Sequence, residues 1–89
     1  MQYTLVALEW DDLVFDIRLY ETNNDRKNPY SELTSQVLGV PYDHALQVLV
    51  EYALELPKDT LIVDRIFHDG EIRAESIMSC EEFNSELSA

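Results

Sequence analysis

Residues 61–78 read LIVDRIFHDGEIRAESIM, two stretches rich in apolar residues that are joined by Asp69 and Gly70. Asp-Gly is a favoured dipeptide for a type I′ turn, in which both central residues need a positive φ angle. The stretch therefore predicts a β-hairpin. On the face expected to line the core, the register pairs Phe67 with Ile72, Arg65 with Ala74, Val63 with Ser76 and Leu61 with Met78. Arg65 on that face then needs an acidic partner or must reach the edge of the sheet.

A second hairpin is predicted from Tyr3 to Tyr20, with Asp11 and Asp12 at its tip. A two-residue loop there would give one almost wholly apolar face, which is typical of a half-buried antiparallel pair of strands. That face pairs Trp10 with Leu13, Leu8 with Phe15, Val6 with Ile17 and Thr4 with Leu19. The opposite, mixed face pairs Glu9 with Val14, Ala7 with Asp16, Leu5 with Arg18 and Tyr3 with Tyr20.

Helices are predicted between the two hairpins and after the second one. Following a polar loop over residues 21–30, Ser31 is a candidate N-cap for a short helix that ends at Gly39. A longer helix is expected from Pro41 to about Leu56, because its apolar residues follow a spacing of three and four. At the C-terminus, Ser79 and Glu82 have the spacing of a capping box that starts a last short helix.

These elements predict one α+β domain over residues 1–89. We expect two layers: a four-stranded antiparallel sheet made of the two hairpins, covered by two central helices and a short C-terminal helix.

Composition limits the class of protein. The chain has 18 Asp and Glu against six Lys and Arg, which gives a formal net charge of -12. Such a surface repels a phosphate backbone or an acidic membrane, so neither direct nucleic-acid binding nor membrane binding is expected. The sequence shows no stretch long enough to span a bilayer and no signal peptide. Cys80 is the only cysteine, which excludes an internal disulfide. We expect a soluble, cytoplasmic protein.

Catalytic and metal-binding motifs are weak. Cys80 with His44 or His68 could form a thiolate pair, but Glu81 and Glu82 beside the cysteine would raise its pKa. Oxygen ligands for a divalent ion could come from two clusters, His68 with Asp69 and Glu71, or Asp11 with Asp12 and Asp16. Neither cluster has the spacing of a known metal motif. The prediction is a protein that is not an enzyme, with no catalytic residue, no metal and no cofactor.

The unusual charge suggests a basic protein as the partner. Carboxylates four apart on a helix, such as Glu51 and Glu55, lie ~6 Å apart along the axis, close to the ~7 Å between alternate phosphates. Glu71 and Glu75, on either side of Arg73, offer a similar repeat on a strand. The mixed sheet face would add aromatic and aliphatic contacts. We therefore expect partner-binding residues at Glu9, Asp11, Asp12, Asp16, Asp64, Glu71, Glu75, Tyr3 and Tyr20.

The leading hypothesis is a small inhibitor or decoy that binds the basic nucleic-acid-binding surface of a partner protein. Anti-CRISPR and anti-restriction DNA mimics, and immunity proteins that neutralise nucleases, are the functional types that share this size and acidity. The partner would be a nucleic-acid-handling complex or a nuclease. The alternative hypothesis is a structural or assembly module that forms a homodimer through its sheet face. The C-terminal helix could instead cover that face.

Overall fold

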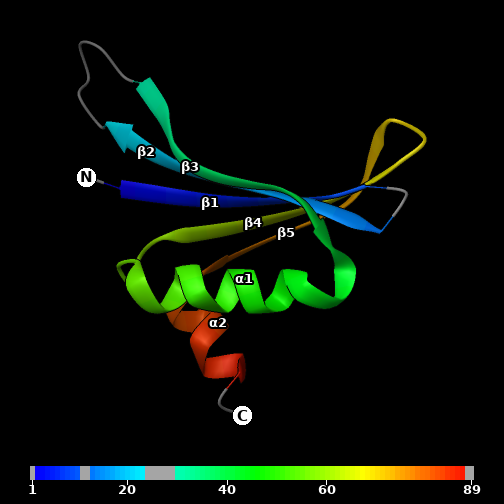
Figure 1. The fold of residues 1–89 in the computed structure, drawn as a ribbon. Coiled ribbons are helices and arrows are strands. Elements are labelled where there is room, and N and C mark those ends of the chain that lie inside the picture. Colours follow the sequence, from blue (N-terminus) through cyan, green and yellow to red (C-terminus); the bar gives the residue numbers. More distant parts are fainter. Residues whose placement is uncertain (1, 11–12, 24–29, 88–89) are drawn as a thin grey trace.

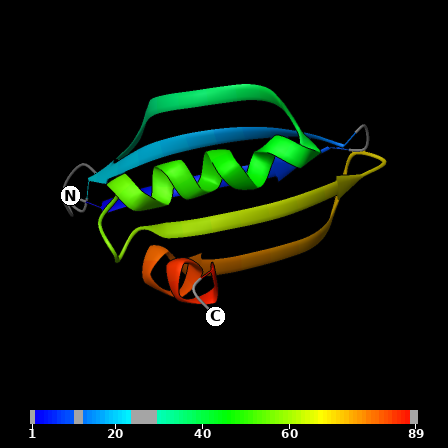
Figure 2. The same cartoon turned by 60° about the horizontal axis from the view of Figure 1, so that its bottom comes forward.

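The computed structural model describes residues 2–10, 13–23 and 30–87 and contains five strands and two helices (Figure 1). In chain order they are β1 (Gln2–Glu9), β2 (Val14–Asn23), β3 (Tyr30–Pro41), α1 (Tyr42–Glu55), β4 (Leu61–His68), β5 (Glu71–Ser79) and α2 (Cys80–Leu87). The strands form one sheet in the order β3-β2-β1-β4-β5. β1 and β4 run parallel, and the other neighbouring strands are antiparallel. Both helices lie on the same face of the sheet (Figure 2).

The prediction of a four-stranded antiparallel sheet with two central helices was wrong. Residues 31–39, expected as a helix, belong to the edge strand β3, which pairs with β2 along its whole length. This pairing satisfies the backbone groups of β3 that face β2, the strand that precedes it in the chain. The helix α1 connects β3 at one edge of the sheet with β4, which lies on the other side of β1 (Figure 1). The hairpins β1–β2 and β4–β5 therefore join through the parallel pair of β1 and β4.

The two remaining helices confirm their sequence signals. α1 follows Pro41 and ends at Glu55, one residue before the predicted end at Leu56. At the start of α2, the Ser79 hydroxyl oxygen accepts a hydrogen bond from the Glu82 backbone N–H at 3.1 Å. The backbone N–H groups of Cys80 and Glu81 donate to the carbonyls of Thr60 and Lys58 at 2.8 and 3.1 Å. The connection after α1 therefore holds the first turn of α2.

The register of the first hairpin differs from the prediction by one residue. The Trp10 backbone N–H donates to the Val14 carbonyl at 2.9 Å, so three residues separate the paired positions instead of two. Leu13 occupies the left-handed region with φ 61°, a conformation typical of the last residue of a three-residue loop. A slip of one residue turns every side chain to the other face of the sheet. Leu5 and Ala7 are therefore in the core, whereas Val6 and Leu8, predicted there, lie on the opposite face.

The second hairpin has the predicted turn and a different register beyond it. Asp69 and Gly70 have φ angles of 53° and 77°, as a type I′ turn requires. Three residues after Gly70, Arg73 forms a β-bulge in β5. It has no partner in β4, because Phe67 pairs with Ile72 and Ile66 pairs with Ala74. This bulge places Arg65 opposite Glu75, and the Arg65 Nε atom lies 2.8 Å from Glu75 Oε2. Arg65 thus has the acidic partner it needs, on the face away from the helices.

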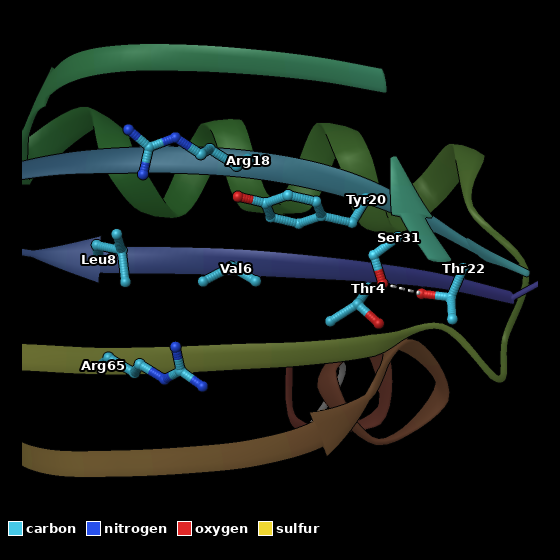
Figure 3. A pocket seen from close by; sticks show the side chains of 8 residues that line it. All are labelled: Thr4, Val6, Leu8, Arg18, Tyr20, Thr22, Ser31 and Arg65. Atoms are coloured by element: carbon cyan, nitrogen blue, oxygen red, sulfur yellow. Dashed lines mark hydrogen bonds between the residues drawn. The ribbon is translucent and has the colours of Figure 1, made fainter. Parts of the chain in front are cut away.

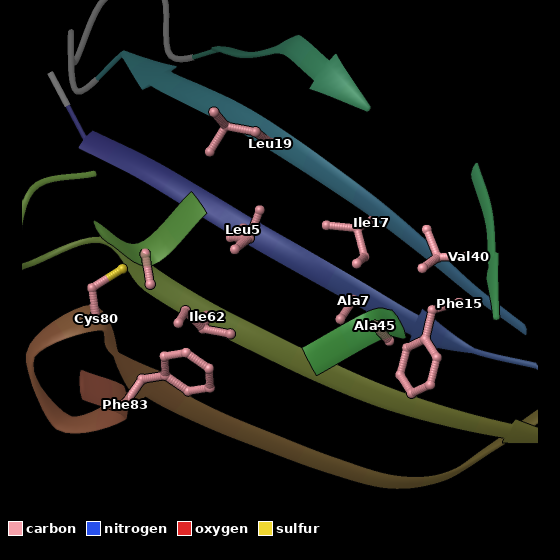
Figure 4. Close-up of a cluster of buried hydrophobic side chains, with 11 residues drawn as sticks. Leu5, Ala7, Phe15, Ile17, Leu19, Val40, Ala45, Ile62, Cys80 and Phe83 are labelled. Carbon is pink, nitrogen blue, oxygen red and sulfur yellow. The ribbon is translucent and has the colours of Figure 1, made fainter. Parts of the chain in front are cut away.

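The core lies between the sheet and the helices (Figure 4). Small residues of α1 bring the helix close to the strands, since Ala45 and Ala53 are both buried. Cys80 and Phe83 of α2 close one end. The buried cluster consists of Leu5, Ala7, Phe15, Ile17, Leu19, Val40, Ala45, Ala53, Ile62, Cys80 and Phe83.

Candidate functional site

The predicted partner-binding residues do not share one face. Asp16, Tyr20 and Glu75 lie on the sheet face away from the helices, and Glu71 lies beside the β4–β5 turn. The register places Tyr3, Glu9 and Asp64 on the helix side, in line with the buried residues Leu5, Ala7 and Ile62. Asp11 and Asp12 are outside the described residues. The mixed face proposed from the sequence was therefore wrong, because it depended on registers shifted by one residue.

Several of these carboxylates bind groups within the sheet. Asp16 accepts hydrogen bonds from Trp10 Nε1 at 2.9 Å and from the Gly39 backbone N–H at 3.0 Å. Glu75 pairs with Arg65, and Glu71 Oε2 lies 3.5 Å from Arg73 Nη2. An arginine partner cancels much of the field of a carboxylate at a distance. On these strands the acidic side chains therefore contribute more to internal order than to attraction of a partner.

Unpaired acidity is concentrated on the helices. We call the exposed side of α1 and α2 the acidic layer. Its carboxylates are Asp43, Glu51, Glu55, Glu81, Glu82 and Glu86. Neither helix contains a lysine or an arginine. Because both helices lie on the same face of the sheet and contact each other, their negative charges reinforce one field (Figure 2).

Exposed apolar side chains lie among these carboxylates. Leu54 of α1 is 72% exposed, Leu46 is 55% exposed and Tyr42 is 59% exposed. The ring of Tyr42 is held at one end of the helix by Phe15, with 5.9 Å between ring centroids. Apolar anchors with a charged border are the usual composition of a protein-binding surface.

A hollow of about 380 Å³ lies beside the first half of α1. Its lining combines two carboxylates with apolar side chains from the helix and the sheet: Phe15, Tyr42, Asp43, Ala45, Leu46, Leu49 and Asp64. Asp64 is the member contributed by β4. It reaches this side of the sheet because the register of β4 places it in line with the buried Ile62.

The Asp64 carboxylate lacks a donor for one oxygen. Its Oδ1 atom is buried and receives no hydrogen bond from any of the residues that the structure describes. Burial raises the pKa of this carboxyl above its ordinary value, since desolvation disfavours the charged form. A cationic side chain in the hollow would stabilise the charged form of the carboxyl. The sequence singled out Asp64 as a candidate partner-binding residue, and its neighbour on β5 is Ser76.

The acidic layer has a signal in the sequence, which is the lack of basic residues in both helical segments. Residues 42–56 and 80–87 contain no lysine or arginine, whereas the prediction rested on the net charge, on the spacings of Glu51 with Glu55 and of Glu71 with Glu75, and on the mixed sheet face. What the sequence did not provide was the contact between the two helices, which brings two short acidic segments to the same face of the sheet.

The cysteine is in an environment that opposes nucleophilic chemistry. Cys80 is fully buried, and burial raises the pKa of its thiol by more than the hydrogen bond with Thr60 lowers it. The negative charge of Asp59 raises this pKa further. Among the described residues, no group of three or more His, Cys, Asp or Glu side chains could hold a metal ion.

Comparison with protein-family models, with curated proteins and with solved structures finds no match to this chain. Within the described ranges, neither helix is long and apolar enough to cross a membrane.

Proposed function

We propose that this protein is a small, non-enzymatic inhibitor or decoy whose acidic layer binds the basic nucleic-acid-binding surface of a partner protein. The partner is a nucleic-acid-handling complex or a nuclease, and the protein acts in the cytoplasm, where such partners work. The observation that carries the proposal is that the two helices hold six carboxylates and no lysine or arginine on one face of the sheet.

The spacing of the carboxylates fits a surface that normally binds phosphates. Glu51 and Glu55 are one helical turn apart, which is ~6 Å along the axis, near the ~7 Å of alternate phosphates. A field of one sign also accelerates the encounter with a basic surface and orients the two proteins before contact. The acidic layer would therefore associate quickly with the basic surface and occupy the sites that bind phosphates of nucleic acid.

Short-range contacts would then slow dissociation. Leu46 and Leu54 offer apolar side chains at the centre of the negative field. The hollow beside α1 offers Asp43 and Asp64 to a lysine or arginine of the partner, and such a side chain would stabilise the charge that burial disfavours at Asp64. Charge thus determines approach, and the hollow determines which basic side chain anchors the complex.

The experiment compares two triple variants with the same change in charge. Glu51→Gln, Glu55→Gln and Glu86→Gln neutralise the acidic layer, while Asp69→Asn, Glu71→Gln and Glu75→Gln neutralise the β4–β5 hairpin. Immobilised protein is exposed to a nuclease-treated lysate of its host at low salt, and duplex DNA is then used for elution. We expect the parent and the hairpin variant to retain the same protein and to release it when DNA or salt is added. We expect the helix variant not to retain that protein.

Two outcomes would contradict the proposal. Equal loss in both triple variants would show that only net charge matters and not the acidic layer. Release by salt but not by DNA would show that the bound surface of the partner is not the one that binds nucleic acid. Circular dichroism of each variant checks that the fold is intact.

A further inference from the structure

The sheet face away from the helices forms a regular grid, which we call the open face (Figure 3). Its rows follow the register across β2, β1 and β4, the three central strands. One row is Asp16, Leu8 and Arg65, the next is Arg18, Val6 and Val63, and the third is Tyr20, Thr4 and Leu61. β3 and β5 extend the grid with Leu33, Gln36, Glu75 and Ile77.

The open face is more apolar than a surface intended for water. Leu33, Leu61 and Ile77 are 43%, 45% and 58% exposed on it. β1 and β4 carry apolar residues on both faces, with the sequences LVAL and LIV at residues 5–8 and 61–63. Strands of this kind occur in sheets that are covered on both sides. Neither helix lies over this face (Figure 1). Of the described strands, β3 rises on this side at Ser31, which borders the hollow of the open face.

The molecule exposes more surface than its mass requires. The accessible surface is 6065 Å², whereas a folded monomer of 10.3 kDa has about 5,400 Å². The flat shape, 40 × 33 × 20 Å, has the same origin, because only one face of the sheet carries helices.

The charge of the open face determines which partner fits. Arg18 and Arg65 line a shallow hollow of about 340 Å³ whose lining has no carboxylate, while Asp16 and Glu75 lie at the same level nearby. The net charge of -12 repels a polyanion and a second copy alike, but a second copy also offers arginines to the carboxylates of the open face, which a polyanion does not. A basic protein would be drawn to the helices instead. A surface of mixed charge and similar apolar character fits best, and a second copy of this chain provides one.

We propose that two copies pack open face to open face, related by a two-fold axis that runs along β1. Such an axis lays β4 of one copy over β2 of the other. Since Asp16 and Arg65 are both register partners of Leu8, Arg65 of each copy then faces Asp16 of the other. In the same way Tyr20 meets Leu61, while Val6 and Leu8 meet their own counterparts. The contact is isologous, so each pair forms twice.

This arrangement also separates the acidic layers. Sheets pack ~10 Å apart, and the helices lie on the outer side of each sheet, so the two acidic layers are well beyond a Debye length of ~8 Å. Each layer stays free for a basic partner. Formation of the dimer does not depend on the proposed function. Salt changes the affinity of the dimer and the affinity for a basic partner in opposite directions. Added salt weakens the binding of a basic partner but strengthens the association of two acidic copies.

Sedimentation equilibrium over micromolar to near-millimolar concentrations, with low and physiological NaCl, tests the dimer. We expect a dimer whose dissociation constant decreases with salt. Thr4→Arg on β1 and Ile77→Arg on β5 each place a new charge in the open face and should weaken association by at least about tenfold. Leu54→Arg adds the same charge on α1, outside the interface, and should leave association unchanged or slightly stronger.

Three results would overturn the proposal. A monomer at every concentration shows that the open face does not bind its own copy. A dimer that is lost in Leu54→Arg but kept in Thr4→Arg uses the helices. A dimer that is lost in Ile77→Arg alone pairs through the edge strand β5. Thermal unfolding confirms that each variant folds, and Leu61→Arg replaces Thr4→Arg if the latter does not.

Discussion

At the scale of single residues, Asp64 destabilises the fold by its buried carboxyl but lines the hollow proposed to bind the partner. Its pKa is raised by burial, and one of its oxygens is buried without a donor among the described residues. An unfolded chain would ionise this carboxyl near the ordinary pKa of 3.8, whereas the folded chain keeps the proton to higher pH. As the pH rises through this window the folded state therefore loses stability, and at neutral pH the charged carboxylate is a net destabilising group.

Replacing Asp64 by asparagine removes that charge with little change in shape. We expect Asp64→Asn to raise the Tm at pH 7 by about 2–4 °C, a small effect because the carboxyl is half exposed to solvent. The gain should shrink as the pH falls toward 4, where the carboxyl of the parent is protonated as well. Thermal unfolding followed by circular dichroism between pH 4 and 8 measures both. A lower Tm at pH 7 would show that Asp64 already has a stabilising partner.

At the scale of elements, β3 shows what a local pattern leaves undetermined. Residues 31–39 have Ser31 where a helix begins, Gly39 where one ends, and Leu33 and Val37 at helical spacing. The same residues make a strand because β2 provides a partner, and no local signal identifies it. The glycine that suggested a helix end has a different task, since its φ of 68° bends the edge strand and directs its N–H to Asp16.

The bend at Gly39 predicts a specific cost of substitution. A Cβ atom at this position would meet nothing within 4 Å, so only the backbone conformation opposes it. We expect Gly39→Ala to lower the free energy of unfolding by about 1 kcal/mol, with a Tm about 4–8 °C lower. Gly39→Asn should recover much of this, because asparagine tolerates a positive φ. Chemical denaturation checks both, and equal losses would point to steric contact instead.

Loops and bulges explain why the candidate site was only partly predictable. The hairpins, α1 and α2 followed from Asp69-Gly70, Pro41 and Ser79, because those residues act on their own neighbours. The faces of β1 and β4 did not follow, because a leucine such as Leu13 does not signal a positive φ and no residue type marks the bulge at Arg73. The face of β2 did follow, since Phe15, Ile17 and Leu19 are buried as expected. Each error of one residue exchanged the two faces of one strand in its hairpin, so the sequence identified acidic side chains but not the surface on which they gather.

At the scale of the whole molecule, half of the net charge of -12 lies on the acidic layer, whose six carboxylates have no lysine or arginine among them. This charge acts on stability as well as on binding. A net charge of -12 on a chain of 89 residues gives a repulsion that salt screens. We expect the Tm to rise with NaCl at one low protein concentration. The triple variant Glu51→Gln, Glu55→Gln and Glu86→Gln should begin with a higher Tm and gain less. Equal salt dependence would show that the helices are not the main source of repulsion.

The parallel contact of β1 with β4 also determines when the protein can be completed during its synthesis. Thr4 lies beside Leu61, so β1 lacks its second neighbour until β4 has been synthesised. Until then the apolar edge of β1 is exposed, a state that invites pairing with other nascent chains. Slow, late closure is expected of a topology dominated by distant contacts. The order of translation, and not only the final energy, thus influences how much of this protein a cell obtains in its native form.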